Sequence, residues 1–356
     1  MPAPLTRSPA LDGLRGVAVL TVLLHNAQYL PGGFLGVDMF FTLSGFLITT
    51  LLVQEWRREG TVNLKAFYAR RAIRLLPALF AMLLMILLLP GLFYTNARPW
   101  QDTFIVVGYI TNWVLAFGWP TMHFHEHTWS LTVEEQFYVI WPPLLITLLK
   151  VKMRRRWILL CVLAGIGVST YLRFVFWSGQ SAGVDRIYYG LDTRFDSLLF
   201  GCLAGLLLPW GFMARATRPV LEHIHVAIWP ATAVLVGSVL FARGDAHVTY
   251  AAVLSVVGLA TATLLLAVVL SSSGLRTWVL DNAALGWIGR ISYGLYLWHD
   301  PIFGHMLSTS RMTRVGIGGL ALLVIRLAVT FGVASLSYYL IEQPCLRFRN
   351  RFVRAA

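Results

Sequence analysis

Two ionisable residues, His25 and Asp38, lie in the largely apolar stretch LTVLLHNAQYLPGGFLGVDMFFTLSGFL, residues 20–47. A glycine-rich turn, PGGFLG, joins the two apolar runs that hold them. An ionisable side chain inside a membrane helix is costly, so it is a candidate for function by default. Imidazole is the usual general base near neutral pH, and a carboxylate can orient it. We therefore predict that His25 acts as a general base and shares a hydrogen-bonded unit with Asp38 or Glu134.

Glu134 belongs to a second polar motif, HFHEHTWSLTVEEQFYVIWPP, residues 123–143. Glu134 and Glu135 begin a predicted membrane helix, and Tyr138 follows Glu134 by one turn. Adjacent carboxylates repel each other in a low-dielectric environment, so at least one requires a cationic or hydrogen-bonding partner. The alternating residues His123, His125 and His127 allow a metal site, but HxHxH alone is a weak signal, and we expect no metal.

A basic motif, FYARRAIRLLP, covers residues 67–77. Arg70 and Arg74 share one face of a helix, and Arg71 lies beside them. Guanidinium groups pair well with phosphate, so the motif predicts a phosphate clamp at a cytoplasmic mouth. We assign Tyr68, in the same stretch, to this site. The alternative is a simple topological anchor, because basic residues are retained on the cytoplasmic side.

Further polar groups interrupt the later apolar runs. LDTRFDSLLFG, residues 191–201, predicts an internal charge pair, and Arg326 must snorkel, pair or face a wet cavity. Ser44 is the only tempting nucleophile, although Ser-Gly steps also serve helix packing. We assign substrate-binding or structural support to Ser44, Trp129, Glu135, Tyr138, Arg194, Asp196, His299 and Arg326.

The elements that must position these residues are apolar runs, each about as long as a membrane-crossing helix. The chain has 356 residues, 57% of them hydrophobic and 13% charged, which is typical of a polytopic membrane protein. Its net charge of +13 lies mainly in short loops, which indicates membrane topology and no nucleic-acid binding. Apolar runs occur at 12–30, 35–54, 75–94, 102–117, 129–149, 157–177, 192–210, 222–242, 248–270, 288–306 and 315–340.

Basic clusters fix the predicted topology. They contain Arg57, Arg58, Lys65, Arg70, Arg71 and Arg74; Lys150, Lys152, Arg154, Arg155 and Arg156; and Arg347, Arg349, Arg351 and Arg354. All three favour the cytoplasmic side, so one run between the first two clusters does not cross. The weakest is 102–117, which is short and contains Gly108 and Asn112. We predict an all-α integral membrane protein with about ten transmembrane helices, one re-entrant or interfacial segment, and both termini cytoplasmic.

Seven motifs in order resemble the membrane-bound acyltransferase family 3, O-acyltransferases that modify sugars, glycans and some antibiotics. They are LDGLRGVAVLTVLLH (11–25), GVDMFFTLSGFLI (36–48), FYARRAIRLLP (67–77), HTWSLTVEEQFYVIWP (127–142), RFDSLLFGCLAG (194–205), ISYGLYLWH (291–299) and IEQPCLR (341–347). The resemblance implies cytoplasmic acetyl- or acyl-CoA as donor, ten transmembrane helices and a catalytic histidine that matches His25. The family's arginine motif matches Arg70, Arg71 and Arg74. Members often carry an SGNH esterase-like domain; we expect one transmembrane acyltransferase domain over 1–356 and no fused SGNH domain.

The residues and the resemblance lead to one expected function. Acyl-CoA docks on the arginines, and His25 activates a hydroxyl of a sugar, glycan or macrolide for direct transfer. Arg15 is assigned to the donor site, and Arg15 or Tyr138 to the oxyanion. The expected partners are acyl-CoA, membrane lipid and the acceptor, without nucleic acid, in the plasma membrane. An exporter of an anionic or acylated metabolite, or a scaffold or flippase partner, remains the alternative; an exporter would not consume the thioester.

Overall fold

The computed structural model describes residues 8–93, 99–119, 125–177, 181–210, 218–244, 246–270 and 279–352. Within these ranges every regular element is a helix. The chain divides into two compact units. Unit 1 comprises Met1–Val62, Leu115–Gly118 and Val133–Arg290, and unit 2 comprises Asn63–Val114, Trp119–Thr132 and Ile291–Ala356.

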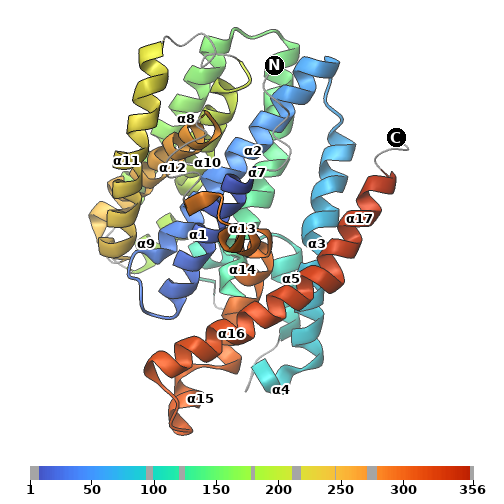
Figure 1. Ribbon diagram of the computed structural model, residues 1–356, viewed down its shortest axis with the longest axis vertical. Helices are drawn as coiled ribbons and strands as arrows, with labels where there is room; N and C mark the ends of the chain where they lie inside the picture. Colours follow the sequence, from blue (N-terminus) through green and yellow to red (C-terminus); the bar gives the residue numbers. More distant parts are fainter. Residues whose placement is uncertain are drawn as a thin grey trace. The chain divides into compact units, whose positions relative to one another are not determined.

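Unit 1 is organised around helix α10, which packs against α2, α8 and α12 (Figure 1). A 3-10 turn precedes α2 at Gly33–Leu35, and a π-helical turn leads into α12 at Thr249–Val253. The helices are α1 (Pro9–Asn26), α2 (Gly36–Glu59), most of α7 (Trp129–Lys150), α8 (Arg155–Phe176), α9 (Ser181–Tyr189), α10 (Leu191–Leu207), α11 (Arg218–Phe241), α12 (Leu254–Leu270) and α13 (Ala283–Arg290).

Unit 2 contains a contact of α14 with α16 and a contact of α3 with α17. The Asn63 side chain caps α3 by accepting a hydrogen bond from the Ala66 amide at 2.9 Å. The helices are α3 (Leu64–Leu88), α4 (Pro90–Phe93), α5 (Pro99–Val107), most of α6 (Thr111–Ala116), the first turn of α7, α14 (Ser292–Asp300), α15 (Thr309–Arg314), α16 (Gly319–Ser337) and α17 (Gln343–Phe352). A 3-10 turn at Glu126–Thr128 and π-helical turns at Pro301–Met306 and Tyr338–Glu342 complete the unit.

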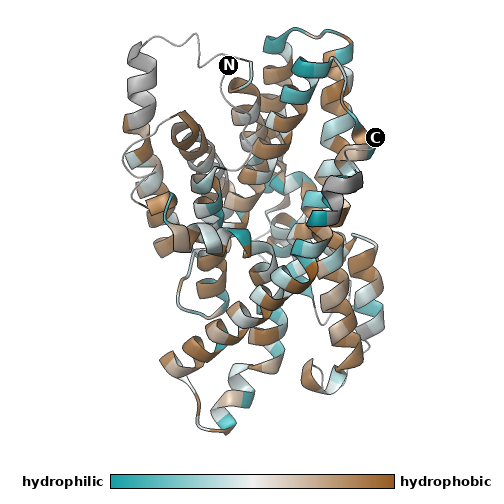
Figure 2. Cartoon of the chain, turned by 45° about the vertical axis from the view of Figure 1, so that its right-hand side comes forward, coloured by the Kyte–Doolittle hydropathy of each residue, from teal (hydrophilic) through white to brown (hydrophobic). Residues whose placement is uncertain are grey.

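Five helical segments in the described part of the chain are long and apolar enough to cross a membrane. They are Gly33–Glu59, Leu64–Leu88, Arg155–Phe176, Thr249–Leu270 and Gly319–Arg347. Figure 2 shows apolar residues along most of the length of the helices. The prediction of an all-helical fold is therefore confirmed for the described residues, and five of its helical segments have the length and apolar character of membrane spans. The full count of ten stays a prediction.

The run 102–117 does not form one continuous helix. It is split into α5, of nine residues, and α6, of six. At 1.5 Å per residue, neither spans the roughly 30 Å of a bilayer core. The run 288–306 is also divided, because α13 ends at Arg290 and α14 begins at Ser292.

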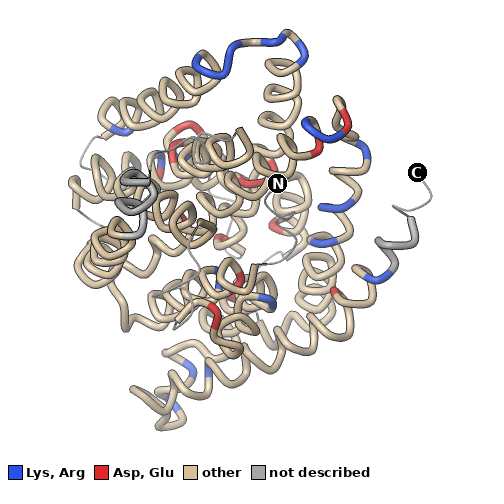
Figure 3. Tube along the Cα trace, turned by 45° about the horizontal axis from the view of Figure 1, so that its top comes forward, with Lys and Arg blue, Asp and Glu red and all other residues tan. Residues whose placement is uncertain are grey.

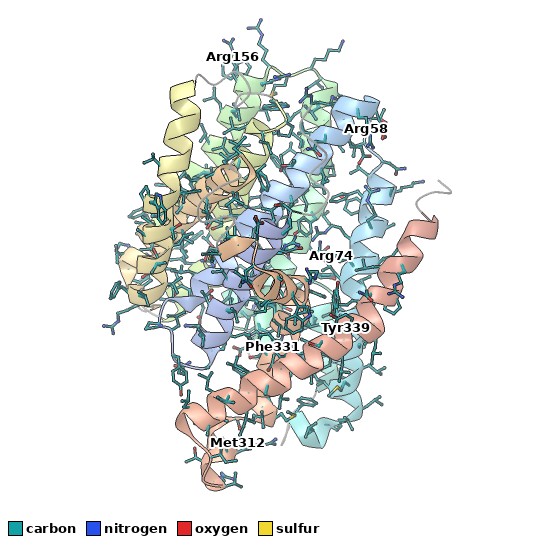
Figure 4. The ribbon with its side chains drawn as sticks, in the orientation of Figure 1. Arg58, Arg74, Arg156, Met312, Phe331 and Tyr339 are labelled. Carbon is teal, nitrogen blue, oxygen red and sulfur yellow. The ribbon has the colours of Figure 1, made fainter. Side chains whose placement is uncertain are left out.

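Basic residues gather at one end of unit 1. Arg58, near the end of α2, and Arg156, in the first turn of α8, lie at the same end of this unit (Figure 4). They belong to the first two basic clusters, which the charge pattern assigns to one side of the membrane.

Close packing of α2 on α10 sets the position of the polar groups in unit 1. A Cβ atom at Gly45 would lie 2.0 Å from the Leu198 carbonyl oxygen, and one at Gly201 would lie 2.0 Å from the Thr42 carbonyl oxygen. Only glycine fits at either position, so the backbones approach as they do at other small-residue contacts between membrane helices. The Ser-Gly step in LSGFL therefore serves this packing.

Candidate active site

His25 lies in the last turn of α1 and is half-buried. Its Nδ1 atom is 3.1 Å from the carbonyl oxygen of Leu30, in the turn that leads to α2. A carbonyl oxygen can only accept a hydrogen bond, so Nδ1 carries the proton in the neutral ring. The lone pair is then on Nε2, which is the arrangement that a general base requires.

Aromatic rings connect His25 to a buried cation within unit 1. The Phe34 ring lies 5.4 Å from the His25 ring, and the Tyr188 ring lies 6.1 Å from Phe34. The guanidinium of Arg194 lies 5.1 Å from the Tyr188 ring centroid. Removal from water raises the pKa of the Tyr188 phenol above its ordinary value, so this group stays protonated at neutral pH.

Asp38 does not partner His25. It is fully buried and accepts hydrogen bonds from Arg194 Nη2 at 3.0 Å and from Ser197 Oγ at 2.8 Å. Both donors come from α10, which the glycine contact holds against α2. The direct His25–Asp38 bond expected from the sequence is therefore wrong, because α10 competes for the carboxylate.

Glu134 is likewise directed elsewhere. It accepts a 2.6 Å hydrogen bond from the hydroxyl of Ser44 on α2. This confirms that one of the two adjacent carboxylates needs a hydrogen-bonding partner, but the partner is Ser44 and not His25. Ser44 is thereby a donor to a carboxylate. The backbone at Leu30 is the group that orients His25 in the structure.

The motif LDTRFDSLLFG contains no internal charge pair. Asp192 pairs with Arg186 of α9 at 2.6 Å, and Arg194 pairs with Asp38. Asp196 binds Arg173 of α8 through two hydrogen bonds, of 2.8 and 2.7 Å. Successive helical residues point about 100° apart, so Arg194, two positions from each aspartate, leaves α10 on nearly the opposite side from Asp192 and Asp196.

Other predicted residues in unit 1 have local partners. Arg15 lies 3.6 Å from Asp12 on the same helix. Tyr138 is buried, with its ring 6.0 Å from that of Phe137. Glu135 is partly buried in the next position of α7.

The arginine motif lies in unit 2, on α3. Arg70 and Arg71 are partly buried, whereas Arg74 is exposed. The Arg74 charge acts on the carboxyl of Glu342, in the π-helical turn before α17. The Tyr68 ring contacts the neighbouring Phe67 ring at 5.2 Å.

A second polar cluster, in unit 2, surrounds His127. Its Nδ1 lies 3.0 Å from Asp300 Oδ2, and its Nε2 lies 3.1 Å from the Leu297 carbonyl oxygen. Both ring nitrogens face acceptor oxygens, so the ring is held from both sides. The Tyr296 hydroxyl donates to the His127 carbonyl oxygen at 2.7 Å and lies 2.6 Å from Ser130 Oγ. This arrangement joins α14 to the start of α7 and occupies both ring nitrogens of His127.

The remaining predicted residues of unit 2 are buried. His299 Nδ1 bonds the Tyr296 carbonyl oxygen at 2.5 Å, and Trp129 is 4% exposed. Arg326 donates to the carbonyl oxygens of Phe303 and Leu307, both at 3.0 Å, so it pairs with the end of a π-helical turn. His123 lies outside the described residues. Among the residues that are described, no group of three or more His, Cys, Asp and Glu could hold a metal.

Sequence reasoning missed the residues that complete these clusters. Tyr188, Ser197 and Asp300 come from segments that the pattern gave no reason to place beside His25, Asp38 or His127. The sequence offers one weak signal for these residues: each is polar and lies within or beside an apolar run. What results chemically is a half-buried imidazole with Nε2 ready to accept a proton.

Comparison with known proteins gives one family. The model of a family described as an acyltransferase domain, Acyl_transf_3, matches residues 8–342. The peptidoglycan O-acetyltransferase OatA of Listeria monocytogenes is 31% identical, over 94% of this chain and 55% of its own length. A putative peptidoglycan O-acetyltransferase of Bacillus subtilis, YrhL, is 33% identical, over 94% of this chain and 54% of its own.

A putative O-acetyltransferase of Staphylococcus aureus strain COL is 31% identical, over 98% of this chain and 58% of its own length. The chain thus spans little more than half the length of the curated relatives it matches. No solved structure gives a significant match.

Proposed function

The chain belongs to the Acyl_transf_3 family of acyltransferase domains, and from this premise we propose that it is a membrane O-acetyltransferase. It moves an acetyl or short acyl group from cytoplasmic acyl-CoA to a hydroxyl of a glycan. One observation carries the assignment of the base: the Leu30 carbonyl fixes His25 Nδ1 as a donor and leaves Nε2 as the acceptor. The names of the relatives support acetyl as the transferred group.

The proposed reaction is a direct transfer. Nε2 of His25 takes the proton of the acceptor hydroxyl as its oxygen attacks the thioester carbonyl. The new C–O bond forms, the C–S bond breaks, and the proton passes to the departing CoA thiolate. Arg15 and Tyr138 are the proposed donors to the tetrahedral oxyanion, because both lie in the same unit as His25.

The donor is proposed to bind through its phosphates. Arg70, Arg71 and Arg74 lie close together on α3, and Tyr68 belongs to the same segment. The exposed position of Arg74 leaves it accessible to an anionic ligand. We further propose ten membrane crossings, both termini in the cytoplasm and a location in the plasma membrane, as the basic clusters indicate.

The acceptor follows from the printed names of the relatives, two of which specify peptidoglycan. A cell-wall glycan is therefore the first acceptor to test. A macrolide acceptor has no support among these names. An exporter of an acylated metabolite is the second candidate function. Buried ion pairs such as Arg173–Asp196 are as compatible with an exporter as with an acyltransferase.

The test uses protein purified into lipid nanodiscs, with acetyl-CoA and cell-wall glycan fragments. We expect thiol release coupled to acetyl transfer, measured by a thiol reagent and by mass spectrometry of the glycan. His25→Ala should abolish both, while His247→Ala, which removes an exposed histidine elsewhere in unit 1, should leave both unchanged. Absence of thioester consumption by the unmodified protein with every glycan would favour the exporter.

A further inference from the structure

Unit 1 contains an apolar groove that the proposed reaction does not use. Helices α7, α8 and α10 line a half-open groove with a volume of about 320 Å³. Its lining is almost wholly apolar and includes Leu144, Leu148, Ile158, Cys161, Leu172 and Leu199. On α8 the lining extends from residue 158 to residue 172, which corresponds to about 21 Å at 1.5 Å per residue. The groove therefore suits a long, narrow, apolar ligand.

One end of the groove reaches a strongly basic turn. Leu148 and Ile158 line the groove next to the turn between α7 and α8. That turn carries Lys150, Lys152, Arg154, Arg155 and Arg156, visible as a blue bend between two helices in Figure 3. In the described part of the chain, no carboxylate forms an ion pair with these five cations. The turn is therefore suited to an anionic group.

We propose that this groove binds one hydrocarbon chain of an anionic phospholipid whose phosphate lies at the basic α7–α8 turn. Basic pockets between membrane helices at the cytoplasmic side are known to take anionic head groups. Both features occur on α8: the apolar groove runs along this helix, and a cluster of cations lies at its first turn. A zwitterionic lipid would supply the chain without matching the charge.

The size of the groove favours a single hydrocarbon chain over a helix as its occupant. An α-helix with side chains is roughly 10–12 Å wide, so a helix lying along the groove could enter it only in part. Gly165 lies in the wall, where a Cβ atom would be 2.7 Å from Leu199 Cδ1. Any larger side chain at this position would project into the channel or displace Leu199.

Occupancy of the groove also bears on the His25 site. Asp192 and Phe195 of α10 line the groove, and Arg194 and Ser197 of the same helix hold Asp38. A bound chain would fill the space beside α10 and support the helix on that face. We therefore expect the lipid to stabilise the unit independently of any acyl transfer.

The binding test is native mass spectrometry of protein moved from detergent into mixtures of phosphatidylglycerol and phosphatidylcholine. We expect one tightly retained phosphatidylglycerol, and loss of its preference over phosphatidylcholine in Lys152→Gln/Arg154→Gln. Gly165→Leu should lose the retained lipid, whereas Gly167→Leu should keep it. Gly167 is the matched control, because it lies on the same helix with open space where a Cβ would be.

A second measurement avoids any effect of substitution on folding of the groove. Cys161 lines the groove and is exposed, whereas Cys202 is buried. In a Cys345→Ser background, phosphatidylglycerol should slow maleimide modification of Cys161 at least fivefold relative to phosphatidylcholine. Equal modification rates in the two lipids, or equal lipid retention by the Gly165 and Gly167 variants, would overturn the proposal. Neither readout depends on acetyl transfer, so failure here is distinct from failure of the proposed function.

Discussion

The Asp38–Arg194 ion pair offers the sharpest test of the structure, because sequence reasoning gave Asp38 a different role. Both side chains are fully buried, and Arg194 Nη2 lies 3.0 Å from Asp38 Oδ2. Ser197 is the only other donor to Asp38 among the described hydrogen bonds. We consider three variants: Asp38→Leu, Arg194→Met and the double substitution. Each single change leaves one charge in a dry interior without its partner.

The expected magnitudes follow from this burial. Breaking a buried ion pair by removal of one partner costs about 3–5 kcal/mol, because the remaining charge is uncompensated. Two independent losses would add to roughly 6–10 kcal/mol. Replacement of both partners by apolar residues is often nearly neutral, so the double variant should be more stable than either single variant. The order of stabilities, not only their size, is the prediction.

Stability would be measured by thermal and denaturant unfolding in one detergent for all variants. A double variant that loses the sum of the single effects would refute the pair as the role of Asp38. A further measurement addresses catalysis: Asp38→Asn should leave the acidic limb of the pH–rate profile unchanged, because Asp38 does not contact His25. A shift of that limb would restore the direct coupling that the sequence predicted.

Three further outcomes are expected. His25→Gln should lower acetyl transfer by about a hundredfold or more without altering the unfolding temperature, because a general base is lost but little volume is; transfer above a tenth of the original rate would contradict this. Arg70→Gln/Arg74→Gln should raise the apparent KM for acetyl-CoA and weaken the salt dependence of this KM, because guanidinium groups that pair with phosphate are lost. Lys65→Gln is the control, because Lys65 is an exposed cation on the same helix. Burial lowers the pKa of His125 to about 3, so below about pH 6.5 the unfolded chain takes up a proton that the folded chain does not. The free energy of unfolding should therefore fall as the pH drops below 6.5. Asparagine tolerates the φ of 64° at this position, so His125→Asn should lose less stability between pH 7 and pH 5 than the unmodified protein. Equal losses for the two proteins, measured by thermal melts at both pH values, would count against this prediction.

The residues of the candidate site could be listed from the sequence, but their hydrogen-bonding partners could not. His25 and Glu134 were found because ionisable groups are conspicuous in apolar runs. The prediction that one of the adjacent carboxylates needs a partner is confirmed, whereas its expected bond to His25 is wrong. The internal pair in LDTRFDSLLFG is also wrong, since Arg194 and Asp196 each bind another helix. The donor site on Arg70 and Arg74 stays a prediction.

The sequence by itself determined the helical class of the fold, because runs of apolar residues of this length satisfy their backbone groups in a membrane only as helices. It did not fix every helix, since the run 288–306 is divided between α13 and α14. It also determined family membership, through short motifs that keep their order along the chain. Tertiary structure alone decided the partner of each buried charge. Helical periodicity gives the direction in which a side chain leaves its helix, but not which helix lies opposite. Asp38 meets Arg194 across 156 positions of sequence because glycines let α2 and α10 touch, and His25 is left with a backbone carbonyl of its own turn.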